Sequence, residues 1–253
     1  MTKRALILGG SSGIGKATAK KIAATFDEIV IVHRDRRQGV SDLEKFIEDV
    51  STTENCTFTT HNIDATDKEK ILEVIQANDK PFQLVLHAIT RGNLGSLDIT
   101  QDKPLRMDDL KLTMDAMCFN VQLWNELLHS NGLLTRGSRF ITLTSEGSTR
   151  SWPGYAAVGM AKASLETLTK YLAVEMSSHG VLYNCIHAGV TDTPSLRLIP
   201  GYDELVDFTK KRNPYHRLTQ PEDVANAIYL LTQPEANWIN GSIIHVDGGE
   251  HLV

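Results

Sequence analysis

Short apolar runs alternate with amphipathic stretches along this chain, and the alternation predicts a parallel sheet with helices on both faces. The runs predicted to be strands are 5–8, 29–32, 56–61, 82–86, 139–143, 183–186 and 242–246. Most are apolar at consecutive positions, which is typical of strands buried on both faces. Between them, helical periodicity predicts helices at 16–26, 67–76, 110–129 and 155–177.

A further helix is expected to begin at Ser41, where Ser41 and Glu44 have the spacing of a capping box. No linker-like stretch or internal repeat interrupts the pattern. We therefore predict one doubly wound α/β domain over residues 1–253. In such a sheet, ligands bind at the carboxyl ends of the strands. Candidate functional residues are thus those that follow each strand.

Composition and charge narrow the class of protein. The 253 residues are 41% hydrophobic and 23% charged, as in ordinary globular proteins, and the formal net charge of −5 disfavours nucleic acid or anionic membrane as the main partner. No signal peptide is apparent, and no apolar run approaches the roughly 20 residues that cross a bilayer. Cys56, Cys118 and Cys185 are widely spaced, and the histidines form no i, i+4 ligand pair. We expect a cytoplasmic protein without a metal site.

A glycine-rich loop joins the first strand to the first helix. Its pattern is Gly9-x3-Gly13-x-Gly15, and its candidate binding residues are Gly9, Ser11, Ser12, Gly13, Ile14 and Gly15. Glycines here leave room for a pyrophosphate against the backbone amides at a helix N-terminus. The alternative is a glycine-rich turn that binds nothing.

A tyrosine and a lysine lie two helical turns apart, at Tyr155 and Lys162, and therefore on one helix face. A phenol has a pKa of about 10, and a nearby ammonium is expected to lower it. Ser145 precedes the tyrosine by ten residues, at the end of a strand. An aromatic residue that packs the entry of a long helix is the alternative.

The Gly9-x3-Gly13-x-Gly15 loop, with the strand before it and the helix after it, resembles the short-chain dehydrogenase/reductase family, as does the chain from end to end. The resemblance implies a nicotinamide dinucleotide cofactor. The further cofactor contacts that it implies are Arg34, Asp64, Ala65, His87, Ala88, Lys162, Gly189, Val190 and Thr193. His87-Ala88 replaces the usual Asn-Ala-Gly, and Ala188 replaces a proline. His187 and His245 are expected to be structural.

The residues after the second strand bear on which dinucleotide is bound. Asp35 lies about 20 residues after Gly15, where the general rule places an acid that selects NAD. In the family, that acid instead corresponds to Val32 or His33, and NADPH-dependent members carry a base at the position of Arg34. An arginine there pairs with a 2′-phosphate. We favour NADPH; a solvated arginine turn is the alternative.

The tyrosine differs from the common family pattern. Most members have Tyr-x3-Lys, but Val158 occupies that tyrosine position, and the usual catalytic asparagine falls near Met117 or Cys118. Tyr155-x6-Lys162 instead resembles the enoyl-acyl-carrier-protein reductases of bacterial fatty-acid synthesis. Many of those enzymes have a second tyrosine at the position of Ser145. In having Ser145 there, this chain resembles the NADPH-using variant of the type found in Bacillus.

The resemblance implies reduction of trans-2-enoyl thioesters on acyl-carrier protein or coenzyme A. Tyr155, Lys162 and Ser145 would be the catalytic residues of a homotetramer built on the two long helices. Segment 193–217 is expected to cover the substrate with the apolar residues Leu196, Leu198, Ile199, Tyr202, Leu205, Val206 and Phe208. Its basic run at 210–212 is a candidate to meet an acidic carrier protein, and a solvated charged face is the alternative. The alternatives are a carbonyl (3-oxoacyl) reductase and an NADP-binding sensor with little turnover.

Overall fold

Seven parallel strands form one sheet in the order β3-β2-β1-β4-β5-β6-β7 in the computed structural model, which describes residues 2–198 and 201–253. The strands are β1 (Arg4–Leu8), β2 (Glu28–His33), β3 (Thr57–Asn62), β4 (Leu84–His87), β5 (Arg139–Ser145), β6 (Leu182–Ala188) and β7 (Ile243–Val246). Because β1 pairs with both β2 and β4, the winding reverses beside it. Ligands bind at such a reversal in doubly wound sheets.

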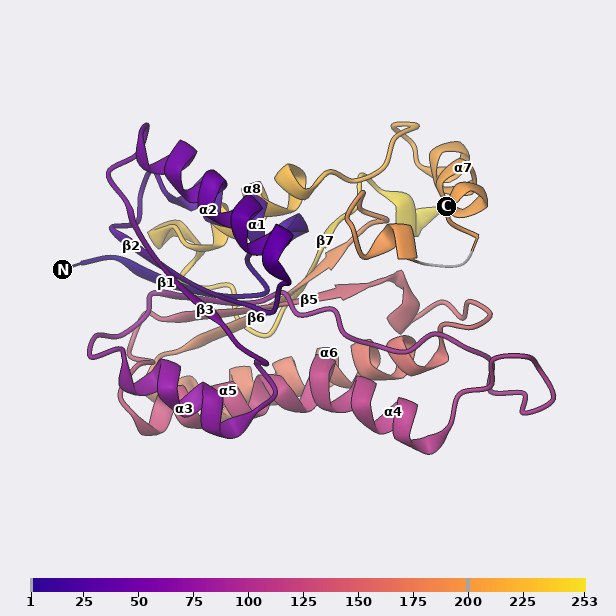
Figure 1. Cartoon of the computed structure of the whole chain (residues 1–253), viewed down its shortest axis with the longest axis horizontal. Helices are drawn as coiled ribbons and strands as arrows, with labels where there is room; N and C mark the ends of the chain where they lie inside the picture. Colours follow the sequence, from indigo (N-terminus) through magenta and orange to yellow (C-terminus); the bar gives the residue numbers. More distant parts are fainter. Residues whose placement is uncertain (1, 199–200) are drawn as a thin grey trace.

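Two layers of helices enclose the sheet (Figure 1). Helices α1 (Gly13–Ile22), α2 (Arg37–Ser51) and α8 (Pro221–Leu231) cover one face, and α3 (Lys68–Gln76), α5 (Asn120–Ser130) and α6 (Ala156–Glu175) cover the other. Each face has its own apolar core. Ile7 and Ile31 belong to the first core, and Leu6 and Val30 to the second. Successive strand residues point to opposite faces, so continuous apolar strands fill both cores. The predicted fold is confirmed.

One predicted helix start is wrong, and one helix was not predicted. Helix α2 begins at Arg37, so Ser41 lies inside it and forms no cap. Its extent follows the buried positions Leu43, Phe46 and Val50, whose helical spacing outweighs the local capping pattern. Helix α8 had not been predicted, although Pro221 at its first position and the buried spacing of its apolar residues are both helix signals.

The predicted helix 110–129 contains a wider turn. Helix α4 (Met107–Met114) continues into a π-helical turn at Asp115–Phe119 and then into α5. Single π turns are frequent at functional sites. Here the turn packs against α6, where Met117 joins Val158 and Ala161 in a small apolar cluster.

The carboxyl ends of the strands, helix α7 (Tyr202–Arg212) and the C-terminus gather at the same edge of the molecule (Figure 1). This is the edge at which the sequence places the candidate functional residues. None of the helices in residues 2–198 and 201–253 combines the length and the apolar character that a bilayer crossing requires.

Candidate active site

Close backbone contacts fix the glycine loop. A Cβ at Gly15 would lie 2.2 Å from the Gly9 carbonyl oxygen, and one at Gly9 would lie 2.7 Å from that of Ala88. Gly9 also has φ of 89°, a left-handed conformation that side chains disfavour. Within the described chain, Ser12 makes no side-chain cap, which leaves the first amides of α1 available to an anion.

The segment after β6 lies over this loop. A Cβ at Gly13 would be 3.1 Å from Cγ2 of Thr193, and the hydroxyls of Thr90 and Ser195 are 2.9 Å apart. The ends of β1, β4 and β6 therefore bring Gly13, Ala88 and Thr193 together. Ala88 and Thr193, both predicted to contact the dinucleotide, thus lie against the glycine loop.

Opposite charges meet beyond the glycine loop. Asp64, after β3, accepts hydrogen bonds from Arg34, after β2, and from Arg91, after β4, the latter at 2.9 Å. Partial burial opposes ionisation, but hydrogen bonds from Thr66 and Arg34 and the charge of Arg91 lower the pKa of Asp64 to about 2. Arg34 keeps an exposed side chain, and Arg91 adds a second cation that sequence reasoning had missed.

Two side chains near the loop are engaged elsewhere. The Asp35 carboxylate lies 2.7 Å from Nδ1 of His33, which weakens its candidacy as a ribose ligand. Nε2 of the buried His87 lies 2.9 Å from Oδ1 of Asn120, and the Asn120 amide donates to the carbonyl of Ala65. Burial lowers the pKa of His87 to about 4, so the ring is neutral near pH 7. A cofactor contact by His87 would therefore come from its backbone.

Tyr155 occupies the N-cap position of α6, at the entry of the helix rather than inside it. Its ring packs against the backbone of Gly147, where a Cβ would lie 2.5 Å from the ring carbon Cε1. Leu94 and Val158 belong to the same apolar cluster. Burial raises the pKa of Tyr155, and the nearby Ser145 hydroxyl lowers it by a smaller amount. Ser145 Oγ itself is buried, with no hydrogen bond of good geometry among the described residues.

Lys162, two helical turns after Tyr155 on α6, is buried. Its Nζ donates a 2.7 Å hydrogen bond to the carbonyl of Leu143 on β5. Burial lowers its pKa to about 8, while the charges of Cys185, Cys118 and Glu166 act in the opposite direction. The π turn therefore presents the Cys118 thiol near this amine, at one of the two positions where the asparagine of related enzymes was expected.

The expected lowering of the Tyr155 pKa by Lys162 is wrong for this structure. The phenol is partly buried among apolar side chains, and desolvation disfavours the phenolate. Tyr155 therefore keeps its proton over the neutral range. A neutral phenol is a hydrogen-bond donor, whereas a phenolate is an acceptor.

An ion pair ties α7 to Glu146, which directly follows β5. Arg212, at the end of α7, binds both carboxylate oxygens of Glu146 at 2.6 Å and also binds Glu250. The Arg212 side chain is 8% exposed. It is therefore unavailable to an acidic carrier protein, which corrects that part of the predicted basic run. Lys210 and Lys211 are exposed.

Apolar contacts also hold this segment in place. Phe208 of α7 meets Trp152 edge to face with ring centroids 5.8 Å apart, directly before the turn that leads to Tyr155. Leu196 is buried, and Tyr202, Leu205 and Val206 are partly buried. Ile199 lies outside the described residues.

Comparison with known proteins fits this geometry. A family model described as "Enoyl-(Acyl carrier protein) reductase" matches residues 9–251. The chain belongs to this family. "Enoyl-[acyl-carrier-protein] reductase [NADH] FabI" of Enterococcus faecalis is 39% identical over 161 residues, which are 64% of this chain and 60% of that protein. "Enoyl-[acyl-carrier-protein] reductase [NADH] 2" of Rhizobium meliloti is 27% identical, over 99% of this chain and 92% of its own length.

Solved structures agree on the fold of this enoyl reductase family member. A short-chain dehydrogenase from Burkholderia cenocepacia, in complex with NADP, superposes with a TM-score of 0.84. It is 24% identical, and the superposition covers 98% of each chain. The predicted family and the predicted oxidoreductase fold are thus confirmed.

Sequence reasoning missed several side chains of this family member's site. Glu146 and Arg212 are far apart in sequence, and so are Asp64 and Arg91, and only the fold brings each pair together. Gly147 could have been found, because a glycine two residues after Ser145 and eight before Tyr155 implies a close approach.

Proposed function

We propose that this protein reduces the C2=C3 double bond of trans-2-enoyl thioesters with NADPH. The observation that carries the proposal is the position of Tyr155 on the entry turn of α6 beside Ser145, where desolvation raises the pKa of the partly buried phenol. Membership of the enoyl reductase family supports the reaction class. The two named relatives support acyl-carrier-protein-linked substrates.

The chemistry suits a donor at this position. A bound dihydronicotinamide supplies a hydride. When C3 of the substrate accepts that hydride, the π electrons move onto the thioester oxygen, two carbons away, and a proton then reaches C2. Tyr155 would donate a hydrogen bond to that oxygen, as preorganised donors do in an oxyanion hole. Ser145, with a buried hydroxyl, would be an auxiliary donor.

The shift of the tyrosine relative to the common family pattern fits this substrate. Three residues along a helix move a side chain by about 4.5 Å. A ketone reductase needs its acid at the oxygen bonded to the carbon that is reduced, whereas an enoyl reductase needs it further away. Lys162 would hold the nicotinamide ribose and keep the local charge positive, as its buried amine beside β5 allows.

Arg34 supports the preference for NADPH. Its exposed guanidinium lies beyond the glycine loop, and Arg91 can keep Asp64 neutralised if Arg34 turns to a 2′-phosphate. The Enterococcus relative is named for NADH, and the Burkholderia structure holds NADP. Replacement of Arg34 by Ala should weaken NADPH binding about tenfold and leave NADH binding unchanged. Equal loss for both dinucleotides would remove the phosphate role.

The surroundings of Tyr155 support an acyl substrate. The apolar cluster of Leu94, Met117 and Val158 lies beside the ring, and segment 193–217 would cover the chain. Exposed Lys210 and Lys211 remain candidates to meet an acidic carrier. Met160, Tyr171 and Val174 are exposed apolar residues on α6, which supports the homotetramer built on the long helices. A cytoplasmic location belongs to the same proposal.

One assay tests the reaction directly. NADPH oxidation should be fast with a crotonyl thioester and at least about 100-fold slower with an acetoacetyl thioester. The reverse order would identify a carbonyl reductase. Binding of NADPH without oxidation by either thioester would identify a sensor with little turnover.

A further inference from the structure

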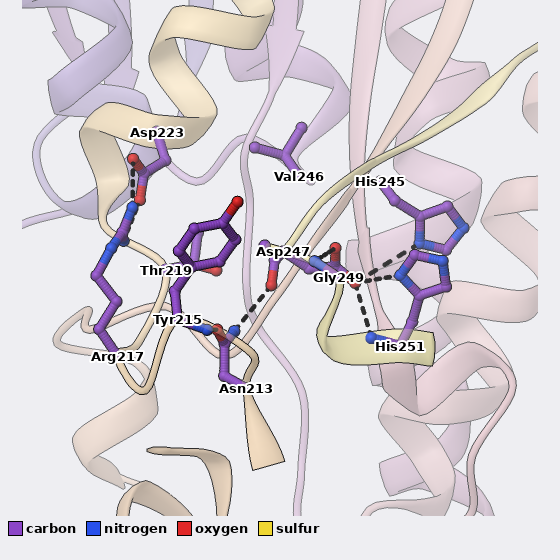
Figure 2. Close-up of a pocket in the computed structure, with 11 residues that line it drawn as sticks. Asn213, Tyr215, Arg217, Thr219, Asp223, His245, Val246, Asp247, Gly249 and His251 are labelled. Atoms are coloured by element: carbon purple, nitrogen blue, oxygen red, sulfur yellow. Dashed lines mark hydrogen bonds and ion pairs between the residues drawn. The ribbon is translucent and has the colours of Figure 1, made fainter. Parts of the chain in front are cut away.

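Three histidines meet at the carboxyl ends of β6 and β7. His187 and His245 are direct neighbours in the strand register, with ring centroids 4.3 Å apart. His251, in the short C-terminal turn, stacks on His245 with a centroid distance of 3.8 Å. Figure 2 shows the rings of His245 and His251 facing each other beside the carboxylate of Asp247.

Asp247 places a fixed carboxylate against these rings. One carboxylate oxygen lies 2.5 Å from Nδ1 of His251 and 3.9 Å from Nδ1 of His245. The backbone amides of Gly249 and His251 also donate to this carboxylate, at 2.9 and 3.0 Å. Its side chain is 4% exposed. The carboxylate is therefore held in one orientation before any ligand arrives.

His187 carries an unpartnered nitrogen in this cluster. The residue is 3% exposed, and its buried Nδ1 has no hydrogen-bond partner in residues 2–198 and 201–253. A buried polar atom without a partner costs roughly 1–3 kcal/mol. An imidazole nitrogen without a hydrogen-bond partner is available to bind a metal ion.

We propose that His187, His245 and Asp247 bind a divalent transition-metal ion of the zinc type. One ligand atom from each residue lies within 4.8 Å of the others. Two imidazoles and a carboxylate are ligands that zinc takes at about 2.0–2.2 Å, so the three groups would close by up to roughly 1.5 Å around the ion. The His245 side chain is 38% exposed and would make most of that movement.

The surroundings leave a fourth coordination position. His245, Asp247 and His251 line a cavity of about 560 Å³, which Tyr215 and Arg217 close on the opposite side (Figure 2). Three protein ligands and an open side are typical of zinc sites that also bind water or a small ligand. His251 is a positioning residue, because it holds the Asp247 carboxylate and supports the His245 ring.

The site adjoins the proposed active site without being part of it. His187 directly precedes the Ala188-Gly189 turn, and a Cβ at Gly189 would lie 2.9 Å from that of Asp247. Asn213, after α7, donates a 2.9 Å hydrogen bond to the Asp247 carbonyl. A metal ion here would fasten the ends of β6 and β7 beside the segment that is proposed to cover the substrate.

The test is a metal titration of the full chain without a histidine tag, stripped with a chelator beforehand. Co²⁺ binding is followed by its visible absorption, and Zn²⁺ competition gives the zinc affinity. We expect about one ion per chain. His245→Ala should weaken binding at least about 100-fold and His251→Ala about tenfold, as losses of a ligand and of a supporting residue. Zinc should raise the unfolding temperature of the wild type but not of His245→Ala.

His179→Ala is the matched control. His179 and His129 form a second close histidine pair, with centroids 4.3 Å apart, but no third candidate ligand joins them in the described residues. The His179→Ala variant should bind Co²⁺ and Zn²⁺ as tightly as the wild type does. Failure of the wild type to bind Co²⁺ or Zn²⁺, or equal affinity of His245→Ala and His179→Ala, would overturn the proposal. Neither outcome depends on enzyme activity.

Discussion

The edge of the sheet at which the parallel strands end has two halves, and these are built in different ways. At the ends of β1 to β4, the site consists of backbone amides, glycine contacts and exposed charges such as Arg34 and Arg91. At the ends of β5 to β7, it consists of buried or partly buried polar side chains such as Tyr155, Lys162 and His187, whose pKa values are all shifted by desolvation. The first half is suited to bind a ligand by shape and charge, and the second to act on one.

This difference predicts two kinds of variant. Changes in the nucleotide half should alter affinity, with turnover at saturation preserved wherever binding survives. Changes in the catalytic half should alter turnover, with dinucleotide affinity preserved.

The largest expected effect is at Gly15. In Gly15→Ala, the new Cβ would lie 2.2 Å from the Gly9 carbonyl oxygen, so the loop must move. We expect affinity for NADH and NADPH alike to fall more than about 100-fold in fluorescence titrations. Gly137→Ala is the control, since a Cβ there meets open space within the described chain although φ is 89°. Gly137→Ala should lower the free energy of unfolding by about 1 kcal/mol and leave the dinucleotide affinity unchanged. Unchanged binding by Gly15→Ala would contradict the loop's role.

Lys162 should show opposite effects on activity and stability. Lys162→Met is expected to reduce turnover about 100-fold and to stabilise the fold, because a buried charge is replaced by an apolar chain of similar size. The pKa of Lys162 is about 8 in the folded state and 10.5 ordinarily, so the unfolded chain holds this proton more tightly. Wild-type stability should therefore rise between about pH 8 and 10.5. The extra stability of Lys162→Met relative to the wild type should be largest below about pH 8 and should shrink between about pH 8 and 10.5.

Urea unfolding at several pH values measures this difference. Lys170→Met, which changes an exposed lysine on the same helix, is the matched control and should alter the free energy of unfolding by no more than about 0.5 kcal/mol. A stability difference at Lys162 that stayed constant from pH 7 to 10.5 would contradict the burial of a charged amine there.

A smaller effect is expected at Gly147, which sets the position of the tyrosine. In Gly147→Ala, the added methyl would lie 2.5 Å from the Tyr155 ring and displace it. We expect kcat to fall about tenfold while dinucleotide affinity stays within twofold of wild type. Thr149→Ala, in the same turn but exposed, should change neither. A wild-type kcat in Gly147→Ala would show that the ring position is not critical.

Local patterns predicted the parts of the molecule that depend on local contacts. The apolar runs identified the seven strands, and glycine spacing identified the loop between β1 and α1. The histidine cluster could not be found this way, because His187 and His245 become neighbours only through the register of β6 and β7. The pKa of Tyr155 was likewise mispredicted, since Leu94 and Gly147 bury the ring from other parts of the chain. No residue pattern marked the π turn.

The most direct test of the proposed mechanism is the turnover of Tyr155→Phe with a crotonyl thioester at saturating NADPH. The variant removes one hydroxyl and keeps the ring that packs on Gly147. We predict a fall in kcat of about 100-fold or more, the usual effect of losing a preorganised donor, with NADPH affinity unchanged. A kcat within twofold of wild type would show that the phenol does not stabilise the developing charge, and would contradict the account.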